Sequence, residues 1–215
     1  MLEPEIEKLV VFDLDGVLLD LRTGALQNLA MQLGNVRKAS KIYLEYSKKI
    51  EEPSWRFDEI VNMLKGKRIE QARRIVQTFP ITEGAEHTLN ELKNRGYFIG
   101  VFTTAPEFVV DILAEKLPID IECGTILETK GNVFTGKIIE QIDRYAKAKY
   151  LEQVMAENDL QRGDVTVVGD SVIDVPMGER AGLFIAFNPK DRYIIESADR
   201  IFVKKDLRFL LNVLK

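Results

Sequence analysis

The stretch KLVVFDLDGVLLD, residues 8–20, constrains the fold more than any other part of the chain. Its continuous apolar run predicts a strand over 9–13 that is buried on both faces. A strand with one solvent-exposed face would instead alternate apolar and polar residues. The run ends in Asp13, and a second acid, Asp15, follows two places later, just before Gly16. Two carboxylates at the end of a buried strand repel each other unless a cation lies between them. The sequence therefore predicts a cation site at the end of this strand.

The rest of the chain predicts an α/β fold in which a helical segment interrupts a repeated strand–helix pattern. Residues 21–79 carry apolar side chains at helical spacing, which indicates a small helical bundle. After Pro80, strands and helices alternate, and such β-α units joined by short connections imply a mostly parallel, Rossmann-like sheet covered on both faces. We expect a core domain of residues 1–20 and 80–215. The helical segment would be a cap domain inserted after the first strand, covering the carboxyl edge of the sheet.

Local signals place the later elements. Predicted strands span residues 97–102, 164–170, 183–187 and 200–203, and predicted helices span 82–96, 144–158 and 205–214, with another beginning near Pro106, a short one ending at Gly182 and a hairpin turning at 130–132. Thr82 is the predicted N-cap of the helix 82–96, and Gly96 is its predicted stop.

Composition and charge exclude several classes of function. A net charge of −4 argues against a general nucleic-acid binder, which needs a basic face. No segment approaches the roughly 18 apolar residues that a membrane-spanning helix requires. The single cysteine, Cys123, excludes an internal disulfide framework and suits a reducing compartment. We therefore expect a cytoplasmic monomer or homodimer whose partner is a small molecule, neither a nucleic acid nor a membrane.

Polar residues gather where the predicted strands end, and open α/β sheets bind ligands beyond the carboxyl ends of their strands. These residues are Asp13 with Asp15, Thr103 with Thr104, Asp170 and, one turn later, Asp174. Mg²⁺ is usually held by one or two carboxylates together with substrate oxygens. We expect Asp13 and Asp170, on strands adjacent in space, to hold the ion, with Asp15 and Asp174 as further candidate ligands.

The same residues suit the transfer of a phosphoryl group to a carboxylate. Asp13, rigid at a strand end and screened by the metal, is the candidate nucleophile that forms an aspartyl phosphate. Asp15 is the candidate acid that protonates the leaving oxygen and then, as a base, deprotonates water. Thr103 and Thr104 are candidate phosphate-binding residues at the start of a helix, and Lys147 would offset the charge of the phosphate.

Four motifs carry a resemblance to a known family. The stretches FDLDGVL, VFTT, Lys147 and GDSVID, in this order, resemble the four motifs of the haloacid-dehalogenase (HAD) superfamily, and the chain is most similar to phosphoserine phosphatases of archaeal type. The resemblance implies a Rossmann-like core with a helical cap, Mg²⁺ and phosphomonoester hydrolysis. Superfamily dehalogenases lack the second acid and P-type ATPases carry Thr there, so Asp15 implies a phosphatase or a phosphomutase.

The departures from the phosphoserine phosphatase pattern concern the substrate. Arg22 stands where those enzymes carry a Glu that binds the ammonium group of the substrate, and Ile60 falls where they carry an Arg that binds its carboxylate. Ile173 replaces their usual Asn, and Arg56, one helical turn before Ile60, is a candidate substitute for the missing Arg. We therefore expect a Mg²⁺-dependent phosphatase of a small phosphorylated metabolite with altered substrate-binding residues. A true phosphoserine phosphatase is the alternative.

Other functions fit less well. A phosphomutase needs a second phosphate contact from the cap, and the basic residues of the segment 65–74 are more simply a solvated face. A non-catalytic phosphate-binding relative would lack Asp13, Asp15 or Lys147, and all three are present. A receiver-type signalling domain also uses an Asp acceptor, Mg²⁺, a Thr and a Lys, but its acceptor ends a later strand, and the large helical insertion is foreign to that class.

Overall fold

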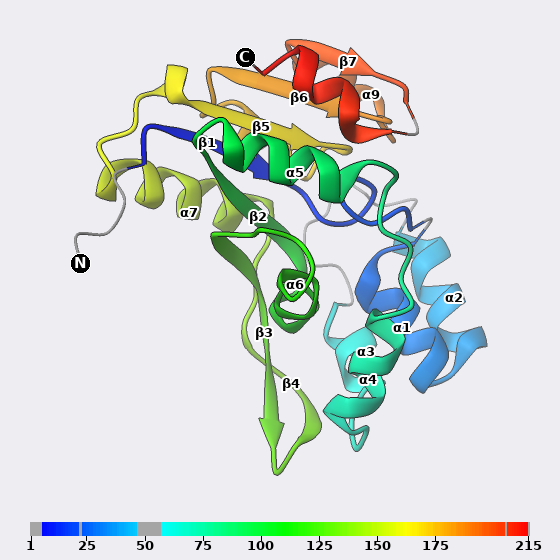
Figure 1. Cartoon of the computed structure of the whole chain (residues 1–215). Coiled ribbons are helices and arrows are strands. Elements are labelled where there is room, and N and C mark those ends of the chain that lie inside the picture. The colour runs from blue at the N-terminus through cyan, green and yellow to red at the C-terminus, as the bar shows by residue number, and fades with distance from the viewer. Residues whose placement is uncertain (1–5, 22, 47–56, 205, 215) are drawn as a thin grey trace.

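The computed structural model describes residues 6–21, 23–46, 57–204 and 206–214, and within them it has the predicted α/β architecture (Figure 1). A seven-stranded sheet has the order β4-β3-β2-β1-β5-β6-β7, and it is parallel except for β4, which runs antiparallel to β3. The strands are β1 (Lys8–Phe12), β2 (Tyr97–Pro106), β3 (Ile121–Lys130), β4 (Val133–Glu140), β5 (Val165–Gly169), β6 (Leu183–Phe187) and β7 (Arg200–Phe202). Because β1 lies between β2 and β5, residues that follow these three strands meet at one edge of the sheet.

Apolar layers cover both faces of the sheet. The helices of these layers are α5 (Ala85–Asn94), α6 (Glu107–Ala114), α7 (Arg144–Glu157), α8 (Val175–Gly178), α9 (Arg192–Ser197) and the 3-10 helix η2 (Leu207–Asn212). Successive side chains of a strand point to opposite faces. In β1, Val10 and Phe12 belong to the cluster that contains α5, α6 and η2, whereas Leu9 and Val11 belong to the cluster that contains α7 and α9. Burial on both sides explains why this strand has no polar residue after the exposed Lys8.

Four of the described helices lie between β1 and α5, in the inserted segment. They are α1 (Ala25–Leu33), α2 (Val36–Tyr46), α3 (Phe57–Asn62) and α4 (Ile69–Val76). Figure 1 shows them gathered at one end of the sheet, apart from the helices that flank its faces. The two connections to the core run side by side, because the N–H of Asp20 donates to the Pro80 carbonyl at 2.9 Å and Leu19 pairs with Ile81. The insertion after β1 confirms the predicted fold class, while the division into two domains stays a prediction.

The inserted helices also contact the long β3–β4 hairpin, which extends beside α3 and α4 (Figure 1). Backbone hydrogen bonds join the two parts. The N–H of Gly66 donates to the Phe134 carbonyl at 2.9 Å, and the N–H of Phe134 donates to the Lys67 carbonyl at 3.0 Å. The N–H of Ile69 donates to the Asn132 carbonyl at 3.1 Å. The insertion is thus attached at its two connections and at the hairpin.

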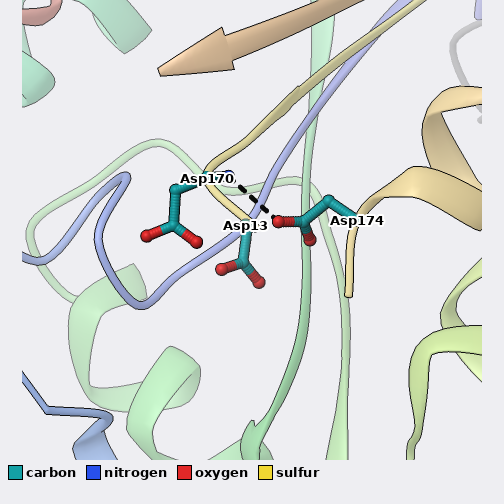
Figure 2. Close-up of side chains that lie close together, drawn as sticks. All are labelled: Asp13, Asp170 and Asp174. Atoms are coloured by element: carbon teal, nitrogen blue, oxygen red, sulfur yellow. Dashed lines mark hydrogen bonds between the residues drawn. The ribbon is translucent and has the colours of Figure 1, made fainter. Parts of the chain in front are cut away.

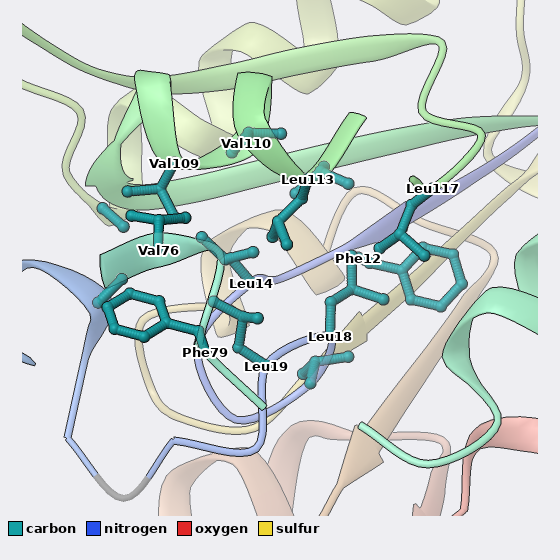
Figure 3. Close-up of a cluster of buried hydrophobic side chains, with 14 of the residues drawn as sticks. Phe12, Leu14, Leu18, Leu19, Val76, Phe79, Val109, Val110, Leu113 and Leu117 are labelled. Atoms are coloured by element: carbon teal, nitrogen blue, oxygen red, sulfur yellow. The ribbon is translucent and has the colours of Figure 1, made fainter. Parts of the chain in front are cut away.

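A continuous hydrophobic cluster links the insertion to the sheet (Figure 3). Its members include Leu14, Leu18 and Leu19 from the segment after β1, Val76 and Phe79 at the end of the insertion, and Val109, Val110 and Leu113 of α6. The segment that carries Asp15 is therefore held by apolar residues on both sides, which fixes the backbone of the site.

Most predicted elements are confirmed to within a few residues. The hairpin turns at Gly131 and Asn132, whose φ angles of 57° and 68° are those that a two-residue hairpin turn with two left-handed positions requires. Gly96 follows α5 with a φ of 84°, as a helix stop does. Cys123 is buried, and no helix of the described segments has the length and apolar character needed to cross a membrane.

Two local predictions differ from the structure, and one short helix was not predicted. Thr82 is not the N-cap of α5, because its N–H bonds to the Leu18 carbonyl and Gly84, in the left-handed region, takes the cap position. The final predicted helix is a 3-10 helix, η2. The short helix α9 was not predicted, although its cap is an ordinary one: Asp191 accepts from the backbone N–H groups of Tyr193 and Ile194.

Candidate active site

Three buried carboxylates meet beyond the ends of β1 and β5 (Figure 2). Asp13 follows β1, Asp170 follows β5, and Asp174 precedes α8. Carboxylate oxygens of the three lie within 4.8 Å of one another. The adjacency of the strands produces this meeting, since the N–H of Asp13 donates to the Val168 carbonyl at 2.9 Å. The prediction that Asp13 and Asp170 lie on neighbouring strands is confirmed.

Asp174 folds back over the end of β5. Its Oδ2 accepts hydrogen bonds from the backbone N–H groups of Asp170 at 3.0 Å and Ser171 at 3.3 Å. Gly169 makes this possible, because a Cβ at that position would lie 2.4 Å from the Cβ of Asp174. The sequence GDSVID therefore forms a tight loop in which the carboxylate of Asp174 accepts a hydrogen bond from the backbone of Asp170.

Lys147 lies at the centre of the site. Its Nζ is fully buried and contacts Asp13 Oδ1 at 2.7 Å and Asp174 Oδ1 at 2.6 Å. It projects from the first turns of α7, where Asp143 caps the helix by accepting from the N–H groups of Tyr145 and Ala146. Burial by itself would lower the pKa of the ammonium, but the charges of Asp13 and Asp174 outweigh it and raise that pKa above its ordinary value. Lys147 is therefore a permanent cation.

The charge of Lys147 does not fully offset the cost of burying the carboxylates of Asp13 and Asp170. Burial, followed by the charge of Asp174, raises the pKa of Asp13 although Lys147 opposes the shift. Burial also raises the pKa of Asp170 well above its usual range. A raised carboxyl pKa means that the site disfavours further negative charge, so additional positive charge would stabilise it. Buried carboxylates of this kind are suitable ligands for a hard divalent cation.

Asp15 takes a different orientation from Asp13. The N–H of Ala25 donates to its Oδ1 at 2.9 Å and to its Oδ2 at 3.0 Å. Burial, followed by the charge of Asp13, raises the pKa of Asp15 to about 7. A carboxyl with this pKa can both donate and accept a proton near neutral pH. Gly16, with a φ of 95°, turns the chain directly after Asp15.

Lys190, after β6, also belongs to the site and was missed in the sequence. Its Nζ lies 2.5 Å from Asp170 Oδ2 and 3.2 Å from the carbonyl oxygen of Asp15. A Cβ at Gly16 would lie 1.8 Å from Asp170 Oδ2 and 2.6 Å from this Nζ, so only glycine fits there. The available signal was the position of Lys190 just beyond β6, the neighbour of β5. The two oxygens converge on one positive group, so the residues present fit a cation.

Thr103 and Thr104 lie in the last part of β2, which continues to Pro106 beyond its predicted end. The register pairs Phe12 with Val101, so Thr103 reaches the same edge as Asp13. Thr103 is buried, and its Oγ1 accepts from the N–H of Ala105 at 3.0 Å, which leaves its hydroxyl proton free to point elsewhere. The carbonyl of Thr104 accepts from Thr125 Oγ1 at 2.9 Å.

Of the three predicted substrate residues, the structure describes only Ile60. Arg22 and Arg56 lie outside the described residues. Ile60 lies in α3, where its side chain is 3% exposed and packs in the main hydrophobic cluster. The roles given to these three positions therefore stay predictions.

Comparison with known proteins gives consistent similarities. The sequence profile of one family, described as haloacid dehalogenase-like hydrolase, matches residues 7–182. A phosphoserine phosphatase of Methanocaldococcus jannaschii is 32% identical over 214 residues, which cover 97% of this chain and 98% of the relative. A phosphoserine phosphatase of Archaeoglobus fulgidus is 32% identical over 97% of this chain, but the match covers only 60% of that relative.

Solved structures are also similar. One is a phospho-aspartyl intermediate analogue of phosphoserine phosphatase, with a TM-score of 0.85 and 30% identity over 98% of this chain and all of the other. Another is a substrate-bound phosphoserine phosphatase complex, with a TM-score of 0.83 and 29% identity over 99% of this chain and all of the other.

Proposed function

Because this chain belongs to the haloacid dehalogenase-like hydrolase family, we propose that it hydrolyses phosphomonoesters through an aspartyl phosphate on Asp13. One observation carries the proposal. Asp13 is fixed at the end of β1 by Lys147, while Asp15, two residues away, has a pKa of about 7. A rigid carboxylate beside a carboxyl that exchanges a proton near neutral pH is what nucleophilic phosphoryl transfer requires.

In the first step, a carboxylate oxygen of Asp13 attacks phosphorus in line with the leaving oxygen. A bond forms between Asp13 and phosphorus, the bond between phosphorus and the leaving oxygen breaks, and Asp15 gives its proton to that oxygen. Protonation avoids the release of an alkoxide, which is a poor leaving group. The alcohol then departs and Asp15 is left ionised.

In the second step, water attacks the phosphorus of the aspartyl phosphate. Asp15 takes a proton from this water, the bond between phosphorus and Asp13 breaks, and inorganic phosphate leaves. Both carboxyls return to their starting states. One residue thus serves as acid and base in turn, which its pKa of about 7 permits.

We propose Mg²⁺ as the cation of the site. Asp13, Asp170 and the carbonyl oxygen of Asp15 would hold it. Bound there, the ion would neutralise charge that spreads over the phosphoryl oxygens. Both oxygens of Asp174 are engaged, one by Lys147 and the other by backbone N–H groups. Asp174 would position Lys147 and stays a candidate ligand, because its carboxylate lies with those of Asp13 and Asp170 in one cluster.

Thr103 and Lys147 would bind the phosphate. Lys147 supplies a buried positive charge 2.7 Å from the nucleophile, where it offsets repulsion between Asp13 and the incoming dianion. The hydroxyl proton of Thr103 is free to point at a phosphate oxygen. Thr104 is only partly buried, and its carbonyl is already engaged, so it would contribute less.

We propose two candidate classes of substrate. Arg22 would repel the ammonium group of an amino acid, which favours a small anionic or neutral phosphomonoester. Phosphoserine is the second candidate, because relatives similar over nearly the whole chain are phosphoserine phosphatases.

A phosphate-release assay with Mg²⁺ tests the function. It would cover phosphoserine, sugar phosphates, phosphoglycolate, nucleotides and p-nitrophenyl phosphate, with Asp13→Asn as the matched inactive protein. We expect the wild type to release phosphate and Asp13→Asn to retain less than about a hundredth of that rate, since the nucleophile is lost. Retention of a tenth of the rate would contradict the nucleophile assignment. Preference for phosphoserine would contradict the role given to Arg22.

A further inference from the structure

The position of Lys190 raises a question that the proposed reaction leaves open. Its Nζ contacts Asp170 Oδ2 at 2.5 Å and the Asp15 carbonyl at 3.2 Å. These are two of the three groups assigned to the cation in the proposed function. An ammonium and a divalent cation cannot occupy the same place, and at contact distance they repel each other strongly. One of the two must leave when the other arrives.

The backbone of Lys190 is held by hydrogen bonds on both sides of the loop, whereas its side chain is partly exposed to solvent. The N–H of Lys190 donates to the Asp170 carbonyl at 2.7 Å, which ties the loop after β6 to the loop after β5. The next residue, Asp191, accepts from the N–H of Val172 at 2.7 Å and so adds a second tie. The side chain of Lys190 is 43% exposed. A long, flexible side chain with an open path to solvent can rotate away while its anchor stays in place.

Lys147 gives the contrast within the same site. Its Nζ is completely buried between Asp13 and Asp174, so it has no open path to solvent. Of these two lysines, only Lys190 can therefore move its ammonium group out of the site into solvent. Asp170, almost fully buried, needs a positive neighbour at all times, because an unpaired buried carboxylate is costly.

We propose that Lys190 is a resident cation of the metal-free protein, which holds the place of the divalent ion between Asp170 and Asp15 and swings out when that ion binds. This inference rests on the metal site of the proposed function. Lys190 would then set the metal affinity of the site, because its ammonium balances the charge of Asp170 and must be displaced before the metal enters.

Calorimetric titration with Mg²⁺, without substrate and at mildly alkaline pH, tests the competition. Lys190→Met removes the competing charge with little change in side-chain length, and it should tighten Mg²⁺ binding about fivefold, since a partly exposed ion pair of about 1 kcal/mol no longer has to be broken. Lys190→Arg keeps the charge and should bind Mg²⁺ less tightly than Lys190→Met. Lys116→Met, at an exposed position after α6, is the matched control and should bind as the wild type does.

A second measurement uses only the wild-type protein, so it does not depend on how the variants fold. Lysine acetylation read by mass spectrometry should label Lys190 several-fold faster with Mg²⁺ than with a chelator, because the released amine loses its ion pair. Lys116 should react equally in both conditions. If Lys190 reacts no faster with Mg²⁺, or if Lys190→Met binds Mg²⁺ no better than the wild type, the inference is wrong.

The two proposals fail in different ways. Absence of Mg²⁺ binding in the wild type and in every variant would overturn both this inference and the metal site of the proposed function. If Mg²⁺ binding and phosphatase activity are normal but the acetylation of Lys190 does not change with Mg²⁺, only the inference about Lys190 is overturned.

Discussion

The backbone N–H of Ala25 donates to both carboxylate oxygens of Asp15, at 2.9 and 3.0 Å. Ala25 is the first residue of α1, the helix that opens the inserted segment. This hydrogen bond favours the ionised form of Asp15, while burial and the charge of Asp13 raise its pKa to about 7. The position and the protonation of the proposed acid therefore depend on where α1 lies.

Gly24→Ala tests this coupling. A Cβ at Gly24 would lie 2.5 Å from Gln27 Oε1 and 2.9 Å from Asp15 Oδ2, while its φ of −62° and ψ of 161° suit any residue. Because Gln27 can move aside, the strain falls on Asp15. We expect kcat to fall about tenfold with a change in Tm of only a few degrees, since a small displacement of a catalytic group is costly for the rate. Steady-state kinetics and thermal unfolding provide the two readouts.

Gln27→Ala is the control for that variant. It removes the other contact of the new methyl group and should leave kcat unchanged. If the double variant Gly24→Ala/Gln27→Ala recovers full activity, the effect came from Gln27 and the coupling to Asp15 is refuted.

Asp15→Asn should separate the two chemical steps. With p-nitrophenyl phosphate the leaving group needs no proton, so the first step survives, whereas water in the second step loses its base. We expect a burst of about one p-nitrophenol per active site, followed by turnover reduced roughly 10²–10⁴-fold. Rapid-mixing absorbance measures the burst. Asp20→Asn, at an exposed position nearby, should show wild-type kinetics, and a mutant without a burst would argue against the role of Asp15 as a base.

Lys147→Met should destabilise the protein as well as inactivate it. The substitution leaves the carboxylates of Asp13 and Asp174 buried without their shared cation, which costs about 3–5 kcal/mol of unfolding free energy when one partner of a buried pair is removed. Urea unfolding in the presence of a chelator measures the loss.

The double variant Lys147→Met/Asp174→Asn removes one unpaired charge together with the lysine. It should be more stable than Lys147→Met alone, because fewer buried carboxylates then lack a partner. Equal stability of the single and double variants would show that the contact between Lys147 and Asp174 contributes little.

Glu122, in β3, should make the stability of the protein depend on pH. Burial, followed by the hydrogen bond and charge of Asp111 and the charge of Glu107, raises the pKa of Glu122 to about 7, above its ordinary value of 4.5. A raised carboxyl pKa means that the folded state binds the proton more tightly than the unfolded state does. The resulting stability is fully present below about pH 4.5 and is lost as the pH rises through about 7.

Glu122→Gln keeps the shape of the protonated carboxyl and removes its titration. We expect it to match the Tm of the wild type near pH 5 and to exceed it by about 2–4 °C above pH 8. Scanning calorimetry across this range measures the difference. Glu196→Gln, at an exposed position of α9, should follow the wild type throughout, and parallel Tm curves for Glu122→Gln and the wild type would contradict the assignment.

The sequence predicted the positions of the reactive groups better than their contacts. Asp13 and Asp170 could be placed because a continuous apolar run predicts a buried parallel strand, and such strands end at a common edge. The partners of Asp174 could not, because its backward fold depends on the room that Gly169 leaves. Lys190 carried no pattern of its own, since a lone lysine in a polar loop looks like any solvated residue until the order of β5 and β6 is known.

The attachment of α4 to the β3–β4 hairpin has a consequence for how this protein can diversify. The bonds between Gly66, Lys67 or Ile69 and the hairpin join one main chain to another, so they do not depend on the side chains of Lys67 and Ile69, while position 66, with a φ of 78°, favours glycine. Residues of the insertion that face a substrate can therefore change without detaching it from the sheet. Substitutions in the inserted helices can therefore change the substrate specificity, while the residues at the carboxyl edge of the sheet keep their geometry.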